Sequence, residues 1–377
     1  MELASLIPHT QVEPRPYQHR IISSTAAMFN GQHKNGAGQL EPAARSVMIE
    51  SPTGSGKTVM GLLTAKLMQK QHGIKVGWVA MRRNLLTQTA EENQRMGIDV
   101  EPIHFISMFE KNPPTDLDLL VVDEAQHDAA TSMAHLHNTI RPKWILGLTA
   151  TPFRTDRIKL CFDKVIKDAG IHQLIQDGFL SQYDHYTIPC WNVRTVAEFY
   201  LREPKRWGKS IFFFRKIEEC FELREILVAQ GVVCEVVTGS SNREEQIGKF
   251  LSGQVPVLIN CMVLTEGFDC PNLQTVFCRD SAKGPTMQMC GRAFRKHPDV
   301  PVKNVVQSKL TKWPFTKVAL ARDQYLWQED EWRSLAVNPM INTVNSRARL
   351  AIANINVDLP TFVKRNRDRR PNFLHDN

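Results

Sequence analysis

Residues 51–58 read Ser51-Pro-Thr-Gly-Ser-Gly-Lys-Thr58, and this stretch decides the fold class. The segment before it, Ser46-Val-Met-Ile-Glu50, has the apolar pattern of a short buried strand. The segment after it, residues 59–68, has the apolar spacing of a helix. A strand, a glycine-rich turn and a helix in this order hold phosphate groups at the helix N-terminus. The stretch therefore predicts an α/β fold with a phosphate-binding loop.

The loop departs from the pattern G-x-x-x-x-G-K-[ST] only at its first position, where Ser51 replaces glycine. In this pattern the lysine reaches the β- and γ-phosphates and the last hydroxyl binds Mg²⁺, which predicts these roles for Lys57 and Thr58. We therefore expect ATP and Mg²⁺ as cofactors. The loop residues expected to bind the nucleotide are Thr53, Gly54, Ser55, Gly56, Lys57 and Thr58.

A second acidic motif follows an apolar run in Leu119-Leu-Val-Val-Asp123-Glu124-Ala-Gln126. A strand that ends in two carboxylates supplies the groups that phosphoryl transfer needs beside the phosphate loop. We expect Asp123 to hold Mg²⁺ and Glu124 to orient and polarise the attacking water. A solvated acidic strand end is the alternative for these two residues in isolation, and Lys57 in the same chain disfavours it.

The tetrad at 123–126 resembles the DEAD and DEAH boxes of superfamily 2 helicases. Further stretches resemble motifs of the branch that holds RadD-like helicases and type I restriction motor subunits, and they follow in that family's order. Tyr17 and Gln18 lie in a stretch that resembles the adenine-reading Q motif. Gln126 departs from the histidine of DEAH members, and Ser51 from the usual alanine or glycine. The matching stretches are Arg15-Pro-Tyr-Gln18, residues 78–89, residues 147–154 and Asp177-Gly-Phe-Leu180.

The resemblance continues in the second half of the chain. Residues 263–269, Val-Leu-Thr-Glu-Gly-Phe-Asp, resemble motif V, whose Gly267 and Asp269 are then expected to approach the nucleotide. Residues 288–295, Gln-Met-Cys-Gly-Arg-Ala-Phe-Arg, resemble motif VI. A guanidinium clamp stabilises the charge that spreads over a transferring phosphoryl group, which predicts catalytic roles for Arg292 and Arg295, with Gln288 beside them.

The resemblance implies two tandem RecA-like domains, each a mostly parallel sheet flanked by helices, with ATP in the cleft between them. The expected nucleic-acid contacts are Arg83, Gln88, Ser107 and Thr265. Side chains of these types favour phosphate and sugar, so we expect binding that tolerates sequence and weakens with salt. The motif forms favour DNA over RNA. The expected division is 1–155 for the first domain, 156–205 for a connector, 206–335 for the second domain and 336–377 for a basic tail.

Composition fits this interpretation. The 377 residues carry a formal net charge of +8, which suits a polyanionic partner. The 8 cysteines form no C-x-x-C pair, which disfavours zinc and favours a reducing compartment. No N-terminal secretion signal and no apolar run long enough for a membrane helix are visible, so we expect a cytoplasmic protein. The aromatic residues of segment 298–335 are expected to pack rather than to stack on bases.

The leading functional hypothesis is an ATP-dependent DNA helicase or translocase that acts on duplex or branched DNA. We expect the isolated protein to be a monomer. Three alternatives remain at this point. The chain is otherwise an ATP-gated nucleic-acid clamp, the motor subunit of a complex with a separate nuclease or recruitment partner, or an RNA helicase. Intact Glu124, Arg292 and Arg295 favour turnover over a clamp.

Overall fold

The computed structural model describes residues 3–127, 131–150, 162–261, 263–264 and 269–335. The chain divides into two compact units, Met1–Arg333 and Ser334–Asn377, and the fold and the site belong to the first. The basic tail expected at 336–377 lies outside the described residues.

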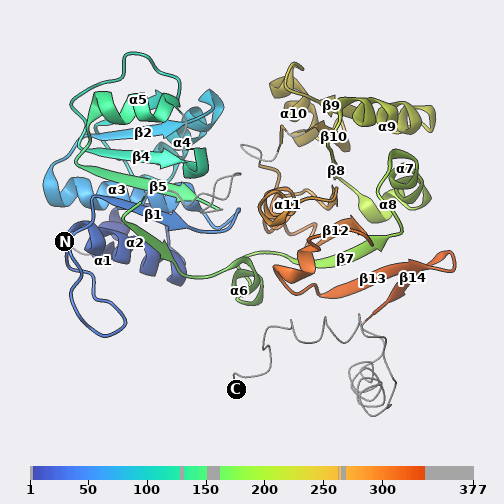
Figure 1. Cartoon of the computed structure of the whole chain (residues 1–377), viewed down its shortest axis with the longest axis horizontal. Coiled ribbons are helices and arrows are strands. Elements are labelled where there is room, and N and C mark those ends of the chain that lie inside the picture. The colour runs from blue at the N-terminus through green and yellow to red at the C-terminus, as the bar shows by residue number, and fades with distance from the viewer. Residues whose placement is uncertain (1–2, 128–130, 151–161, 262, 265–268, 336–377) are drawn as a thin grey trace, which may run out of the picture. The chain divides into compact units, whose positions relative to one another are not determined.

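The first sheet has six strands in the order β3-β2-β4-β5-β1-β6, and each neighbouring pair runs parallel (Figure 1). All five residues of β4 are buried, as expected for a central strand covered on both faces. The carboxyl ends of β1, β4 and β5 therefore meet at one edge of the sheet, where parallel α/β sheets place ligands. The strands are β1 Ser46–Glu50, β2 Val76–Ala80, β3 Ile103–Ser107, β4 Leu119–Asp123, β5 Trp144–Thr149 and β6 Lys164–Lys167.

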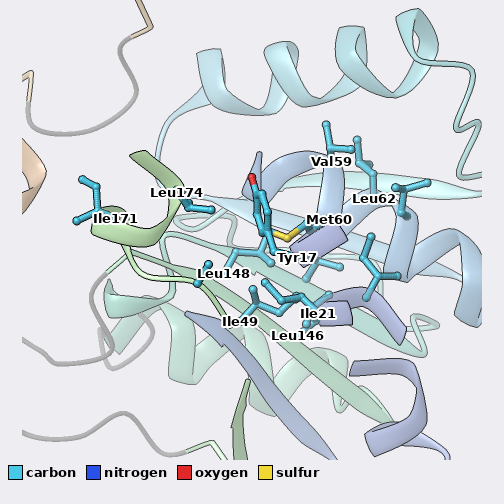
Figure 2. Packing of buried hydrophobic residues seen from close by; sticks show 14 of the residues in the cluster. Tyr17, Ile21, Ile49, Val59, Met60, Leu62, Leu146, Leu148, Ile171 and Leu174 are labelled. Carbon is cyan, nitrogen blue, oxygen red and sulfur yellow. The ribbon is translucent and has the colours of Figure 1, made fainter. Parts of the chain in front are cut away.

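Helices cover both faces of this sheet. On one face, side chains from α2, α3, β1 and β5 form a continuous apolar core, part of which Figure 2 shows around Tyr17, Ile49 and Met60. On the other face, Met133 and Leu136 of α5 close a second, smaller core. The helices that belong to this half are α1 Leu3–Leu6, η1 Ile7–His9, α2 Pro16–Phe29, α3 Lys57–His72, α4 Arg83–Arg95, η2 Ala125–His127, α5 Thr131–Ile140 and α6 Ile171–Gln176.

The second sheet has eight strands in the order β14-β13-β7-β12-β11-β8-β10-β9. Strands β7 to β13 pair in parallel wherever their register is defined. Its strands are β7 Gln182–Ile188, β8 Ser210–Phe214, β9 Cys234–Val237, β10 Val257–Cys261, β11 Thr275–Cys278, β12 Val302–Ser308, β13 Asp323–Gln328 and β14 Glu331–Ser334. Its helices are α7 Val193–Arg202, α8 Pro204–Trp207, α9 Ile217–Ala229, α10 Arg243–Leu251, α11 Lys283–Cys290 and η3 Phe315–Lys317.

The predicted fold class, an α/β protein with two mostly parallel sheets flanked by helices, is confirmed. The segment 156–205, expected as a connector, supplies a strand to each sheet: β6 pairs with β1, and β7 pairs with β12. The aromatic residues Tyr325, Trp327 and Trp332 pack against the core of the second sheet, which confirms packing for these three. Within the described part of the chain, no helix is long and apolar enough to cross a membrane.

Candidate nucleotide site

A cavity of about 500 Å³ opens at the phosphate loop, and it brings together segments far apart in the sequence. The volume lies in the roughly 300–1,000 Å³ range of small-molecule sites. Both halves of the chain contribute, because α11 and the residues after it approach the loop. The lining residues are Thr53, Gly54, Gly56, Lys57, Thr58, Leu85, Gln88, Thr89, Glu91, Glu92, Arg95, Asp123, Glu124, Asp269, Arg292 and Arg295.

The phosphate loop depends on two glycines in the left-handed conformation. Gly54 and Gly56 both have φ near 81°, a region that residues with a side chain rarely adopt. A Cβ on Gly56 would also lie 2.5 Å from Nε2 of Gln18. Ser51, the one departure from the loop pattern, donates a hydrogen bond of 2.7 Å from its hydroxyl to Oγ of Ser55. The departure therefore adds a buried bond across the base of the loop.

Tyr17 and Gln18 bind the backbone of this loop. The Tyr17 hydroxyl donates to the carbonyl of Ser55 at 2.6 Å, and Nε2 of Gln18 donates to the same oxygen at 2.8 Å. The side-chain oxygen of Gln18 also accepts from the backbone N–H of Arg15 at 2.9 Å. Tyr17 packs edge-on against Phe179, in the stretch 177–180 singled out from the sequence. Both residues expected to read the base are thus fixed to the phosphate loop, and their role in nucleotide binding stays a prediction.

Lys57 is the cation at the centre of the cavity. Desolvation lowers the pKa of its ammonium group from the usual value, and nearby Arg292 and Arg295 act in the same direction. The carboxylates of Glu124 and Asp123 oppose that shift. The ammonium group of Lys57 therefore lies close to both acidic and basic groups. A bound triphosphate would add negative charge and so favour the protonated form of this lysine.

The acidic pair lies at the end of β4 in a strained turn. Glu124 has φ 51°, which is uncommon for a residue with a side chain and typical of functional sites. Its backbone N–H donates to Oδ1 of Asp123 at 2.9 Å. Gln126 donates from Nε2 to Oε2 of Glu124 at 3.0 Å and accepts from the hydroxyl of Thr149 at 2.7 Å. A hydrogen-bonded chain thus joins the carboxylate of Glu124 to the end of β5.

The two arginines reach the cavity from the end of α11. Arg292 is only 7% exposed, and burial lowers the pKa of Arg295 to about 10, with the carboxylate of Glu92 opposing the shift. Arg295 forms an ion pair with Asp269. Gly291 permits the approach, because a Cβ there would lie 3.2 Å from Cβ of Thr53 in the phosphate loop. Gln288, also expected at the site, lies on the last turn of α11 and does not line the cavity.

Helix α4 contributes a wall that the sequence reasoning did not include. Leu85, Thr89 and Glu92 line the cavity from one face, and their spacing of three to four residues is that of a helix face. Burial raises the pKa of Glu92, while Arg95 at 3.9 Å and Arg295 lower it. The helical spacing was visible in the sequence, but which face of the helix meets the nucleotide depends on tertiary packing.

Three of the four expected nucleic-acid contacts lie among the described residues, and their role stays a prediction. Arg83 is exposed at the first turn of α4, and Ser107 ends β3, where its hydroxyl accepts from the N–H of Phe109. Gln88 also lies on α4 and lines the cavity at the phosphate loop. Thr265, together with Gly267, lies outside the described residues.

The lining residues fit a magnesium ion that a nucleotide brings with it. Thr58 and Asp123 face the same cavity, and Mg²⁺ is usually held by one or two protein groups together with substrate phosphates and water. In the described ranges, no group of three or more His, Cys, Asp or Glu side chains is placed to hold a metal unaided.

Comparisons with known proteins agree with this geometry. The family described as "Type III restriction enzyme, res subunit" matches residues 11–109, and "Helicase conserved C-terminal domain" matches residues 191–297. Over these two segments the chain is similar to superfamily 2 helicases, and the first segment is similar to a restriction-enzyme subunit.

Individual relatives are distant. A protein of Saccharomyces cerevisiae that carries the name ATP-dependent helicase IRC3 is 23% identical over 233 residues, 51% of this chain and 34% of that protein. A Lactococcus phage protein of 51.5 kDa is 24% identical over 265 residues, 62% of this chain and 58% of its own length. The chain thus spans about half or less of these curated relatives.

Solved structures share the fold at low identity. The type ISP restriction-modification enzyme LlaBIII bound to DNA has a TM-score of 0.57 at 17% identity, covering 81% of this chain and 28% of that enzyme. A fragment assigned as the HsdR subunit of a type I restriction enzyme from Vibrio vulnificus has a TM-score of 0.59 at 17% identity, covering 87% and 72%. Dbp5 of S. cerevisiae bound to RNA and ADP BeF3 has a TM-score of 0.56 at 18% identity, covering 81% and 86%.

Proposed function

We propose that this chain is a nucleic-acid-dependent ATPase that uses ATP hydrolysis to move on or remodel DNA. The observation that carries the proposal is the single cavity in which Lys57, Glu124, Arg292 and Arg295 converge. These are the groups that phosphoryl transfer requires, although they come from opposite ends of the chain. A structural role for the four would not require them to face one cavity.

Each residue has a definable part in hydrolysis. Lys57 and the helix N-terminus of α3 bind the β- and γ-phosphates. Glu124 orients the attacking water and accepts its proton while the bond from the γ-phosphorus to the bridging oxygen of ADP breaks. Arg292 and Arg295 stabilise the charge on the transferring group. Thr58 and Asp123 would hold Mg²⁺, which neutralises phosphate charge when bound.

The positions of Arg292 and Arg295 in the fold explain why nucleic acid would control ATP hydrolysis. They sit after α11 of the second sheet, whereas the phosphate loop follows β1 of the first. A track that changes the approach of α11 to the loop would therefore change the rate of hydrolysis. This is the coupling that a motor needs.

DNA is the proposed track, and the motif forms and the restriction-enzyme relatives support that choice. The fold alone does not separate the alternatives, because its neighbours include one structure bound to DNA and one bound to RNA. The description of the matching family, a restriction-enzyme subunit, supports a role beside a separate nuclease subunit.

The test is the steady-state ATPase rate without nucleic acid and with single-stranded DNA, duplex DNA, a forked junction or double-stranded RNA, each at two salt concentrations. Strong stimulation by one DNA form, lost in Lys57→Ala, is the expected result. If only double-stranded RNA stimulates the ATPase rate, RNA and not DNA is the track. Lack of stimulation by every nucleic acid would overturn the motor and leave a clamp or a subunit that requires its partner.

A further inference from the structure

A second cavity, of about 200 Å³, lies beside the phosphate loop and is not part of the nucleotide site. Its walls come from the ends of β1 and β5, the start of α6, and the elements α11 and η3. Pro52 lines this cavity, whereas the next residue, Thr53, lines the nucleotide cavity. The same split occurs on α11 and just after it, where Met287 faces the second cavity and Arg292 the first.

The charge of this cavity is one-sided. Lys167, Lys283 and Lys317 line it, and Glu50 is the one carboxylate among its lining residues. Glu50 is already engaged, since its Oε1 accepts from Nζ of Lys167 at 2.6 Å. Two ammonium groups therefore remain without a carboxylate among the groups that line the cavity.

Lys283 and Lys317 converge on one aromatic ring. The Lys283 ammonium lies 5.7 Å from the centre of the Trp313 indole, and that of Lys317 lies 5.3 Å from it. The aromatic face attracts a cation, but two like charges on the same ring repel each other. An anion that contacts both ammonium groups would relieve that repulsion. Trp313 itself is not among the residues that line the cavity.

His172 adds an imidazole ring. Its Nδ1 accepts a hydrogen bond from the backbone N–H of Leu320 at 3.3 Å, which leaves Nε2 as the nitrogen that can donate. The lining thus combines this ring with an excess of positive charge. The cavity is smaller than the roughly 300–1,000 Å³ that drug-sized ligands occupy, so a single small anionic group fits its size better than a nucleotide.

We propose that this cavity is a second phosphate-binding site, separated from the nucleotide site by the phosphate loop. Its ligand is one phosphate group, held by Lys283 and Lys317, in a cavity that Lys167 and His172 also line. Two sources carry that chemistry: inorganic phosphate in solution, which the proposed hydrolysis would also release, and a backbone phosphate of nucleic acid. The site itself does not depend on hydrolysis, so its test is independent of the proposed function.

The test compares Lys283→Gln/Lys317→Gln with a control, Lys205→Gln/Lys309→Gln, which removes the same charge from two exposed lysines that line neither cavity. Binding of inorganic phosphate is measured by ³¹P NMR in a Lys57→Ala background, which weakens the phosphate loop as a competing site. In the otherwise wild-type protein, duplex DNA affinity is measured against salt concentration. Melting temperatures verify that all variants are folded.

We expect the cavity variant, and not the control, to weaken phosphate binding at least tenfold or to lower the salt slope of DNA binding. Each lost phosphate contact on duplex DNA lowers that slope by about 0.9. Loss of phosphate binding alone assigns the site to free phosphate, and loss of slope alone assigns it to the nucleic-acid backbone. A change in both supports a site that accepts either source. If neither measurement separates the cavity variant from the control, the proposal is wrong.

Discussion

Gln126→Leu tests whether Glu124 is held for catalysis by its neighbours. The change preserves most of the side-chain volume but removes the 3.0 Å bond to Glu124 and the 2.7 Å bond from Thr149. A hydrogen bond to a charged group contributes about 1.5–3 kcal/mol. At 1.4 kcal/mol per factor of ten, that corresponds to a fall of roughly 10- to 100-fold if the bond is needed in the transition state.

The assay is steady-state ATP hydrolysis with a saturating nucleic-acid activator. We expect kcat to fall while KM for ATP stays close to wild type, because the bond acts on the carboxylate that orients water and not on the phosphates. Thr149→Val is the graded control, since it leaves the bond between Gln126 and Glu124 in place. A neutral hydrogen bond contributes about 0.5–1.5 kcal/mol, so its effect should stay within roughly tenfold.

A double mutant sharpens the test. In a Glu124→Gln background, Gln126→Leu should change kcat little further, because the group it positions is already disabled. Wild-type kcat in Gln126→Leu, or a change confined to KM, would refute the positioning role. If Gln126→Leu lowers kcat by the same factor in the wild-type protein and in Glu124→Gln, Gln126 acts independently of Glu124.

Three further changes address other parts of the site and fold. Arg295→Ala should lower kcat by about 10³-fold or more in the ATPase assay with little change in KM, and unchanged turnover would contradict a site shared between both halves of the chain. Gly291→Ala places a Cβ 2.6 Å from the carbonyl oxygen of Met287 and 3.2 Å from Cβ of Thr53, so the backbone after α11 must shift and kcat should fall roughly tenfold; wild-type kcat would contradict this. Burial lowers the pKa of Lys303 from 10.5 to about 8, so between those pH values the unfolded chain binds the extra proton and stability rises with pH. Denaturant unfolding should show that this rise in the free energy of unfolding, about 3 kcal/mol, is absent from Lys303→Met, and an identical pH dependence in the two proteins would contradict the prediction.

The strands and the helix around the phosphate loop were predictable from the local sequence. The strand expected at 46–50 is β1, with the same bounds, and the strand that ends at Asp123 is β4. The helix expected over 59–68 lies within α3, Lys57–His72. The local sequence specifies these elements, because an apolar run favours a buried strand or helix and a glycine-rich segment favours a turn. The assignment of Lys57 and Arg295 to one cavity drew on the family resemblance.

The remainder of the site depends on contacts that no local pattern specifies. Glu92 lies on a polar helix, and only the packing of α4 decides that it faces the nucleotide cavity. The bonds from Gln126 to Glu124 and Thr149 join two strands, so they need the register of the sheet. The second cavity likewise brings Lys167 together with Lys283 and Lys317 from segments far apart in the sequence.

The base of the phosphate loop has a consequence for nucleotide affinity. Tyr17 and Gln18 both bind the carbonyl of Ser55, and Ser51 binds its hydroxyl. The loop is therefore preorganised by the folded protein, and the conformational entropy of ordering it is lost during folding instead of during ligand binding. We therefore expect these three side chains, which do not line the cavity, to influence nucleotide affinity through the loop.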